Sequence, residues 1–489
     1  MEGELKVEEI GKVIEVSGPL VKIEGLPTVG MEELLQIGDE EAIVFKIGQE
    51  REFNTLSSSY RDVVWALSLG EEGKIKVGEK VKRLKKVVEV PVGEELLGKV
   101  IDSLGRDVDT KDSIKTKEKR KIEGVSPGIM EREEIRKPLE TGIKIIDALF
   151  PIGRGQRELI IGDRKTGKTT LALDTILNQK DVVCIYTSIG QRRSEISQVL
   201  KTLREYGALS YTIMLVASSE SPVLQYLAPF SAMTIAEYFR DQGKDVLVVL
   251  DDLTKHAWVW RELSLLLGKP PGREAYPGDI FYLHARLLER AAKLNKDYGG
   301  GSISALPICE TKEGEVSEYI PTNLISITDG QLYLEVGPFQ KGIKPAVSVG
   351  LSVSRIGSRA QRKCIREVTQ GLKLILSQHQ ELKKLVQLET KISKEAQKKL
   401  KRGEVLLEIF KQQKHELVDV ATQSMIYYAV LNGFLDDVNL KDVKKFESRF
   451  SEFVNKSYPK FKDELLKNSW TKEIKEKLEK ILQEFKLAE

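Results

Sequence analysis

The spacing of apolar residues changes twice along the chain and divides it into three regions. From Gly11 to about Lys86, short segments alternate apolar and polar residues between glycines and acidic turns, as in Lys12–Val16, Leu20–Glu24 and Ala42–Ile47. A period of two is typical of strands with one buried face. We therefore predict a small antiparallel β-barrel at residues 1–87, closed by a strand over Val81–Val88.

The second region interleaves strands with helices. Its apolar runs Val182–Tyr186 and Val246–Leu250 are nearly continuous, as strands buried on both faces of a parallel sheet must be. This pattern predicts an α/β domain with a mostly parallel sheet at residues 88–360.

The third region is rich in Lys, Glu, Gln and Leu and has no proline between Pro345 and Pro459. It predicts an α-helical domain at residues 361–489. Five apolar residues of its last segment share one helical face: Ile474, Leu478, Ile481, Leu482 and Phe485. Packing within the protein is favoured for this stripe over a membrane or partner surface, because acidic residues balance the nearby lysines.

Composition narrows the class of protein. The 489 residues are 41% apolar and 31% charged, as in soluble globular proteins. The net charge is only +3, from 77 basic and 74 acidic residues, so no global electrostatic argument favours nucleic acid or a membrane surface. The acidic start Met1–Glu9 is not expected to be a signal peptide, and no apolar run approaches the ~18 residues of a membrane span. Cys184, Cys309 and Cys364 are expected to be buried free thiols in a reducing compartment.

The sequence GDRKTGKT at Gly162–Thr169 lies between the apolar run Leu159–Ile161 and a helical pattern over Thr170–Leu177. This is the spacing of a phosphate-binding loop, in which the two glycines let backbone N–H groups converge on phosphate oxygens. Lys168 neutralises the outer phosphates, the Thr169 hydroxyl ligates Mg²⁺, and the helix dipole adds to the anion site. The predicted nucleotide-binding residues here are Gly162, Asp163, Arg164, Lys165, Thr166, Gly167, Lys168, Thr169 and Thr170.

Two positions downstream complete the candidate chemistry. Asp251 ends an apolar strand, where a phosphate-loop protein needs a carboxylate to organise Mg²⁺ and its waters, while Asp252 is open to a helix-capping role. Gln191 follows a strand predicted to end near Ser188, at the place of the residue that activates the attacking water. A glutamine orients a water but cannot take its proton, which predicts slow or absent hydrolysis. Arg355, in the loop SVSRIG, is by spacing alone an exposed surface arginine.

Several long motifs in order resemble the alpha subunits of rotary F-type ATP synthases. They are Gly155–Arg164, Pro270–Asp279, Arg286–Ala292, Pro321–Gly330 and Ser352–Gly357. The resemblance runs from about Gly11 to the C-terminus. Three further segments, Leu173–Gln179, Asp251–His256 and Gly299–Pro307, lean toward the N-type branch of these subunits.

The resemblance implies a subunit that binds Mg-ATP or Mg-ADP without cycling it. Such subunits alternate with beta subunits in a hexamer around a central gamma stalk, and the ring acts with a membrane ion-translocating sector at the cytoplasmic face of the membrane. Gln191 matches the glutamine that alpha has where beta has glutamate. Arg355 matches the alpha arginine that reaches the catalytic nucleotide on the neighbouring beta subunit, and Gln412 matches a glutamine near the adenine.

Departures from the family pattern concentrate around the nucleotide. Lys165 stands where alpha subunits usually have glutamine, and Lys344 where arginine is usual. The Gln-x-Gln near the adenine reads Gln412-Gln413-Lys414, which leaves base selectivity less secure than phosphate binding. The N-terminus is shorter than usual in this family, so the helical extension that docks on the peripheral stalk is expected to be absent and the attachment to be made differently. The transported ion is left open.

Two other functions compete with the alpha-subunit reading. A self-sufficient homohexameric ATPase of the secretion or helicase type also has a barrel and a phosphate loop, but its catalytic carboxylate would have to stand at Gln191. The long helical region would then be unexplained. An ATP-regulated assembly protein with no rotary partner is the second alternative.

Overall fold

The computed structural model describes residues 9–54, 57–71, 73–388 and 393–488. Residues 1–8, on which the expected absence of a signal peptide rests, lie outside the described residues. The chain divides into two compact units. Residues 1–132, 183–309 and 317–327 form the first unit, and residues 133–182, 310–316 and 328–489 form the second.

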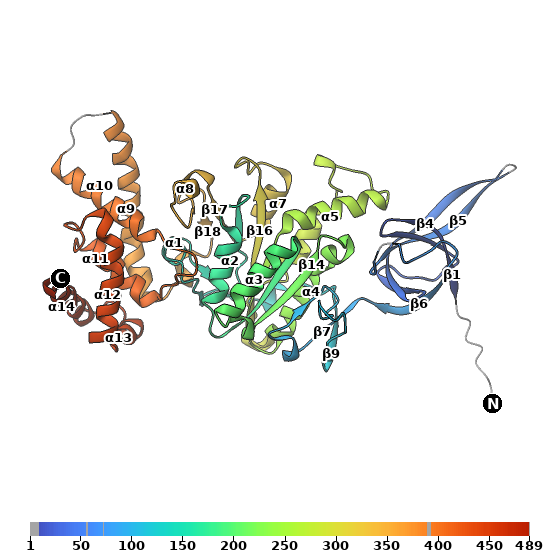
Figure 1. The fold of residues 1–489 in the computed structure, drawn as a ribbon, viewed down its shortest axis with the longest axis horizontal. Helices are drawn as coiled ribbons and strands as arrows, with labels where there is room; N and C mark the ends of the chain where they lie inside the picture. Colours follow the sequence, from blue (N-terminus) through green and yellow to red (C-terminus); the bar gives the residue numbers. More distant parts are fainter. Residues whose placement is uncertain (1–8, 55–56, 72, 389–392, 489) are drawn as a thin grey trace. The chain divides into compact units, whose positions relative to one another are not determined.

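The first unit begins with a closed antiparallel barrel, drawn in blue in Figure 1. Its strands are β1 (Ile10–Ser17), β2 (Leu20–Glu24), β3 (Glu33–Ile37), β4 (Glu40–Asn54), β5 (Ser57–Ser68) and β6 (Lys80–Val87). The order is β1-β2-β5-β4-β3-β6, and β6 closes the barrel because it pairs with both β3 and β1. Alternate residues such as Val13, Ile23, Leu35 and Val81 fill the interior. The predicted barrel and its closing strand are confirmed.

The rest of the first unit is an α/β arrangement. Its strands are β7 (Glu89–Val92), β8 (Val100–Ile101), β9 (Glu118–Lys121), β13 (Val182–Gln191), β14 (Thr212–Ser218), β15 (Asp245–Asp251) and β16 (Ser302–Thr311). Its helices are α3 (Arg193–Glu205), α4 (Pro222–Asp241), α5 (Leu253–Leu266), α6 (Ile280–Leu288) and α7 (Tyr319–Ile327). The strands β16, β15, β13, β14 and β8 are neighbours in that order, with parallel pairing of β16 to β15, β13 to β14 and β14 to β8. Every residue of Val246–Leu250 is fully buried, as expected for a parallel strand covered on both faces.

The second unit contains the remaining strands and the C-terminal helices. Its strands are β10 (Pro138–Leu139), β11 (Ile152–Gly153), β12 (Leu159–Asp163), β17 (Gly330–Leu334) and β18 (Val353–Ser354). Its helices are α1 (Lys144–Leu149), α2 (Lys168–Leu177), α8 (Val336–Gln340), α9 (Lys363–Leu388), α10 (Lys394–Phe410), α11 (Val420–Leu431), α12 (Val443–Ser457), α13 (Phe461–Asn468) and α14 (Lys472–Ala488). The central strand β17 pairs parallel to β12 and antiparallel to β18. Helices α9 to α14, orange to red in Figure 1, form the predicted helical region.

The apolar stripe of α14 packs inside the helical region. All five of its residues are buried, and the Phe485 ring contacts the rings of Phe446 and Phe450. The packing interpretation is therefore confirmed, and so is the prediction of three buried free cysteines.

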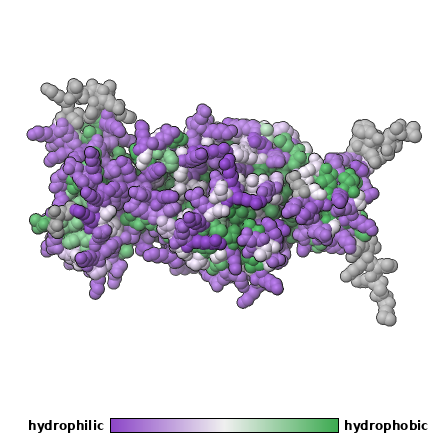
Figure 2. Space-filling view, viewed as in Figure 1, coloured by the Kyte–Doolittle hydropathy of each residue, from purple (hydrophilic) through white to green (hydrophobic). Residues whose placement is uncertain are grey.

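Surface character fits the composition. Hydrophilic side chains predominate on the face shown in Figure 2, with apolar side chains in smaller patches. In the part of the chain that the structure describes, no helix combines the length and the apolar character that crossing a membrane requires. The predicted fold class, a barrel, a mostly parallel α/β sheet and a helical region, is confirmed, while the exact boundaries 1–87, 88–360 and 361–489 stay predictions.

Candidate nucleotide-binding site

The predicted phosphate loop connects β12 to α2 in the second unit. β12 pairs with β17 as far as Gly162, which lies opposite Leu334. A Cβ on Gly162 would lie 2.5 Å from the main-chain oxygen of Leu334, and the residue has φ 154°. Glycine is therefore required where the chain leaves the strand.

Gly167 sets the start of the helix. It adopts a left-handed conformation with φ 98° and caps α2, so that the helix begins at Lys168. The sequence predicted that the helix begins two residues later, at Thr170. That prediction rested on the spacing of apolar residues, which does not reveal the backbone conformation of Gly167. Lys168, Thr169 and Thr170 thus form the first turn of α2, whose N–H groups and dipole favour an anion.

The side chain of Lys168 turns back over the loop. Its ammonium group donates hydrogen bonds to the main-chain oxygens of Gly162 (2.8 Å) and Asp163 (2.7 Å), and the residue is buried. A lysine held in this way brings a positive charge to the mouth of the loop with little loss of side-chain entropy on phosphate binding.

Asp163 and Thr166 brace the loop from inside. The Asp163 carboxylate accepts hydrogen bonds from the Thr311 hydroxyl (2.5 Å) and the Gly314 N–H (2.9 Å). The Thr166 hydroxyl donates to the main-chain oxygen of Asp163 at 2.8 Å. These contacts assign Asp163 and Thr166 to the shape of the loop.

Arg164 and Lys165 face outward from the same loop. Arg164 is exposed and forms an ion pair with Glu310 at 2.8 Å. Lys165 is also exposed and has φ 61°, a left-handed conformation that is uncommon for a residue with a side chain. The Lys165 side chain is therefore accessible to solvent on a loop that its own backbone angle helps to shape.

The candidate carboxylate Asp251 ends β15 in the first unit. It is buried, and its oxygens accept hydrogen bonds from the Tyr186 hydroxyl (2.6 Å) and the Gln191 amide (2.9 Å). Burial and the neighbouring carboxylates raise the pKa of Tyr186 well above its ordinary value, so the phenol keeps its proton and donates it. Tyr186 was not predicted as a site residue, because inside a buried strand a tyrosine is indistinguishable from a core residue.

Gln191 is the last residue of β13 and not part of the following loop. The strand continues three residues beyond Ser188 because Gly190, with φ 61°, allows a bulge in the pairing with β14. The Gln191 amide then donates to Asp251, and its oxygen accepts from the Lys255 ammonium at 2.6 Å. The amide nitrogen and the amide oxygen of Gln191 are thus both hydrogen-bonded within the protein. Neither group can take a proton from water.

The second aspartate, Asp252, caps α5. Its carboxylate accepts the N–H of Lys255 at 2.7 Å, which is the geometry of a helix N-cap. The helix-capping role considered for Asp252 is confirmed.

Gln412 lies in the second unit and is buried. Its amide donates to the main-chain oxygens of Gly142 (2.8 Å) and Glu416, and its oxygen accepts the Lys144 N–H at 2.9 Å. The side chain thus fastens the segment after α10 to the start of α1. A contact with the nucleotide base stays a prediction.

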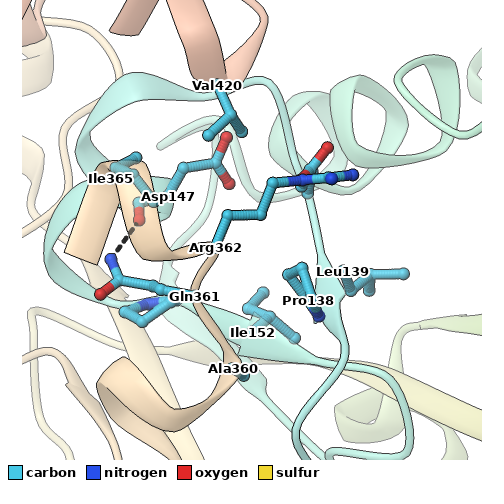
Figure 3. Close-up of a pocket in the computed structure, with 11 residues that line it drawn as sticks. Pro138, Leu139, Asp147, Ile152, Ala360, Gln361, Arg362, Ile365 and Val420 are labelled. Carbon is cyan, nitrogen blue, oxygen red and sulfur yellow. Dashed lines mark hydrogen bonds and ion pairs between the residues drawn. The ribbon is translucent and has the colours of Figure 1, made fainter. Parts of the chain in front are cut away.

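Asp147 stabilises the turn at Thr141 and Gly142, to which Gln412 is hydrogen-bonded. Its carboxylate accepts hydrogen bonds from Thr141, Gly142 and Gln423 at 2.8–3.0 Å. Burial nevertheless raises its pKa to about 6. Figure 3 shows the Gln361 amide bonded to the main-chain oxygen of Asp147, at 2.7 Å, beside a small pocket. That pocket has room for about one water molecule, so it is a packing gap and no nucleotide site.

Two further side chains lie next to the phosphate loop. The Phe339 ring of α8 would be 3.6 Å from a Cβ on Gly167, and the Lys344 ammonium lies 4.6 Å from the centre of that ring. Lys344, the second departure from the family pattern, therefore stacks on Phe339 beside the loop.

Arg355 follows β18 and is exposed. Its N–H donates to the main-chain oxygen of Asp329 at 2.9 Å. Within the described part of the chain, its guanidinium has no hydrogen-bond or ion-pair partner. The backbone of Arg355 is fixed while its charged group is available to a ligand or a neighbouring molecule.

The strand, the glycine loop, the buried lysine and the helix start define a phosphate-loop nucleotide-binding protein. Residues 142–354 match the nucleotide-binding domain of the ATP synthase alpha/beta family, and residues 361–485 match the C-terminal domain of ATP synthase alpha/beta chains. The chain belongs to the ATP synthase alpha/beta family. It is accordingly a nucleotide-binding subunit of a family that forms alpha/beta hexamers in a rotary ATPase complex.

Proposed function

We propose that this chain is the non-catalytic, nucleotide-binding alpha subunit of a rotary ion-translocating ATP synthase or ATPase. The observation that carries the proposal is Gln191, an amide bonded to both Asp251 and Lys255 where a catalytic subunit needs a carboxylate. A site without a general base is expected to hydrolyse its bound nucleotide slowly or not at all.

Each site residue then has a chemical role in holding Mg-ATP or Mg-ADP. Lys168 and the first N–H groups of α2 bind the phosphates, which suits the position of Lys168 over the loop. Mg²⁺ in nucleotide sites is usually held by one or two protein oxygens, phosphate oxygens and waters. The Thr169 hydroxyl fits as a direct ligand and the Asp251 carboxylate as a ligand through water, since Tyr186 and Gln191 hold that carboxylate in one orientation.

Arg355 acts outside its own chain in this proposal. An exposed guanidinium on a fixed backbone suits a group that reaches the catalytic nucleotide of an adjacent beta subunit. Its planar donors match the equatorial oxygens of a transferring phosphoryl group and stabilise the charge there.

The partners follow from the same proposal. They are a beta subunit in an alternating hexamer, a gamma subunit in the central stalk and, through the stalk, the membrane ion-translocating sector at the cytoplasmic face. The alternative of a self-sufficient homohexameric ATPase predicts a carboxylate at Gln191 and leaves the matched C-terminal region without a purpose.

Turnover measured with and without a partner tests this assignment. The isolated chain is expected to bind Mg-ATP and to hydrolyse it far more slowly than the ~10 per second typical of enzymes. Co-expression with a beta-like chain is expected to give an alternating hexamer that hydrolyses ATP. Enzyme-like turnover by the chain alone would support the homohexameric alternative, and failure to form a ring would support the assembly-protein alternative.

Lys165→Gln is expected to weaken retention of Mg-ATP and to make it less sensitive to salt. The substitution removes one positive charge beside the phosphates, and a screened Coulomb attraction between exposed groups falls with ionic strength. The measurement is equilibrium binding to the isolated chain at several salt concentrations.

Arg164→Gln is the matched control. It also removes one positive charge from the loop, but Arg164 already forms an ion pair with Glu310. The control is expected to change the salt dependence less. Equal affinity of Lys165→Gln and the unmodified chain at every ionic strength would show that Lys165 points away from the phosphates.

A further inference from the structure

The loop that carries Arg355 is held by a buried polar network at the amino end of β12. Ser354 connects the Arg355 loop to this network. Its hydroxyl donates to the main-chain oxygen of Pro151 (2.7 Å) and accepts from the Gly357 N–H and the Gln156 amide, both at 3.2 Å. The hydroxyl of the residue next to Arg355 is therefore saturated.

Gln156 is the centre of this network. It is fully buried, and its amide donates to Glu158 (2.7 Å) as well as to Ser354, while its oxygen accepts the Gly153 N–H at 2.8 Å. A glutamine amide has two donors and one oxygen, so a single rotamer satisfies all these bonds. The Glu158 carboxyl, together with the Gly153 N–H, therefore keeps the Gln156 amide directed at Ser354.

Glu158 has no exposed surface and one oxygen without a hydrogen-bond partner. It packs against Gly330, where a Cβ would lie 2.4 Å from its carboxyl oxygen. Burial raises the pKa of Glu158 well above its ordinary value, against the smaller opposing effects of Gln156 and Arg355. A buried carboxyl oxygen without a hydrogen-bond partner carries a desolvation cost, so this carboxyl adds little to stability beyond the bond that it accepts from Gln156.

A second brace holds the other side of the loop. Arg157, between Gln156 and Glu158 in sequence, forms a two-pronged ion pair with Asp329 at 2.7 and 3.0 Å. The main-chain oxygen of Asp329 accepts the Arg355 N–H. Two consecutive residues, Gln156 and Arg157, thus hold Ser354 and Asp329, which lie on either side of the Arg355 backbone.

The geometry points to Glu158 and Gln156 as positioning residues for Arg355: the buried carboxyl orients the Gln156 amide, which fixes Ser354 and thereby the place from which the guanidinium extends. This inference rests on the proposed role of Arg355 at a neighbouring catalytic site. In this inference Gln156 and Glu158 act only through the loop that carries Arg355.

The test compares variants in the ring reconstituted with its beta partner. Gln156→Met and Glu158→Met keep side-chain volume but remove the hydrogen bonds, and each is expected to lower kcat by about 10- to 100-fold, because displacement of a catalytic group by about 1 Å has effects of this size. KM for ATP is expected to stay within about twofold. Glu158→Gln keeps a neutral acceptor for the Gln156 amide and is expected to stay within about twofold of the unmodified ring.

Non-additivity separates positioning from general destabilisation. The double variant Gln156→Met with Arg355→Lys is expected to turn over no more slowly than Arg355→Lys alone, because the network has no function left to serve. Glu134→Gln, which breaks the exposed Arg359–Glu134 pair near the same loop, is the control expected to leave kcat unchanged. Gln156→Asn, with a shorter reach, replaces the methionine variant if that chain does not assemble.

The outcomes distinguish this inference from the function on which it rests. Normal turnover of Arg355→Lys overturns the proposed trans role. Collapse of Arg355→Lys together with near-normal turnover of Gln156→Met and Glu158→Met overturns only the positioning inference. Additive losses in the double variant overturn it as well, since they indicate an effect independent of Arg355.

Discussion

Replacing Arg355 by lysine is expected to collapse ATP hydrolysis by the assembled ring and to leave nucleotide binding at this chain's own phosphate loop intact. The guanidinium is exposed, while the Arg355 N–H donates to Asp329 and the hydroxyl of the preceding residue, Ser354, donates to Pro151. Arginines that reach a phosphoryl group in trans contribute about 10³- to 10⁵-fold in rate. Lysine keeps the charge but loses the planar set of donors, so it is a poor substitute.

The measurement has two parts, namely nucleotide affinity of the isolated variant and turnover of the ring. Arg359→Lys is the matched control, because Arg359 is exposed four residues later and already pairs with Glu134 at 3.0 Å. That control is expected to assemble and to turn over normally. A ring of Arg355→Lys with near-normal turnover would reduce Arg355 to a surface arginine.

Features that depend on neighbours in sequence were predictable. The barrel strands have a period of two in their apolar residues, and Val13, Ile23 and Val81 point inward as that period requires. The phosphate loop is also local, because its glycines, lysine and helix start lie within one short stretch. Both could be read without knowing how distant segments meet.

Contacts between distant residues were not predictable. Gln191, Asp251 and Lys255 were each visible in the sequence, but the shared hydrogen bonds depend on β13 and β15 lying side by side and on the bulge at Gly190. Gln156 and Ser354 are 198 positions apart. No periodicity in one sequence reveals such a pair.

Gln412 illustrates a different limit of sequence reasoning. Its role near the adenine was predicted from a family motif. In the structure, its amide is bonded to main-chain groups of Gly142, Lys144 and Glu416. A motif shows which residue of a chain corresponds to a family position. The hydrogen bonds of the individual chain decide which atoms of that residue remain available to bind a ligand.

Lys168→Ala is expected to remove measurable Mg-ATP binding from the isolated chain. The ammonium lies over the loop, where Gly162 and Asp163 hold it in place. Each charge-assisted hydrogen bond to a phosphate contributes about 1.5–3 kcal/mol. Loss of two such bonds lowers the affinity by at least about 10²-fold.

Arg164→Gln serves again as the comparison. It removes a cation from the same loop, but this cation already forms an ion pair with Glu310. Equilibrium binding and thermal unfolding of both variants separate loss of the phosphate contact from loss of the fold. Lys168→Ala is expected to remain folded, because Gly162 and Gly167 set the loop conformation through their own backbone angles. If this variant binds Mg-ATP within about tenfold of the unmodified chain, the phosphates are held elsewhere, and the assignment of this loop as the nucleotide site is wrong.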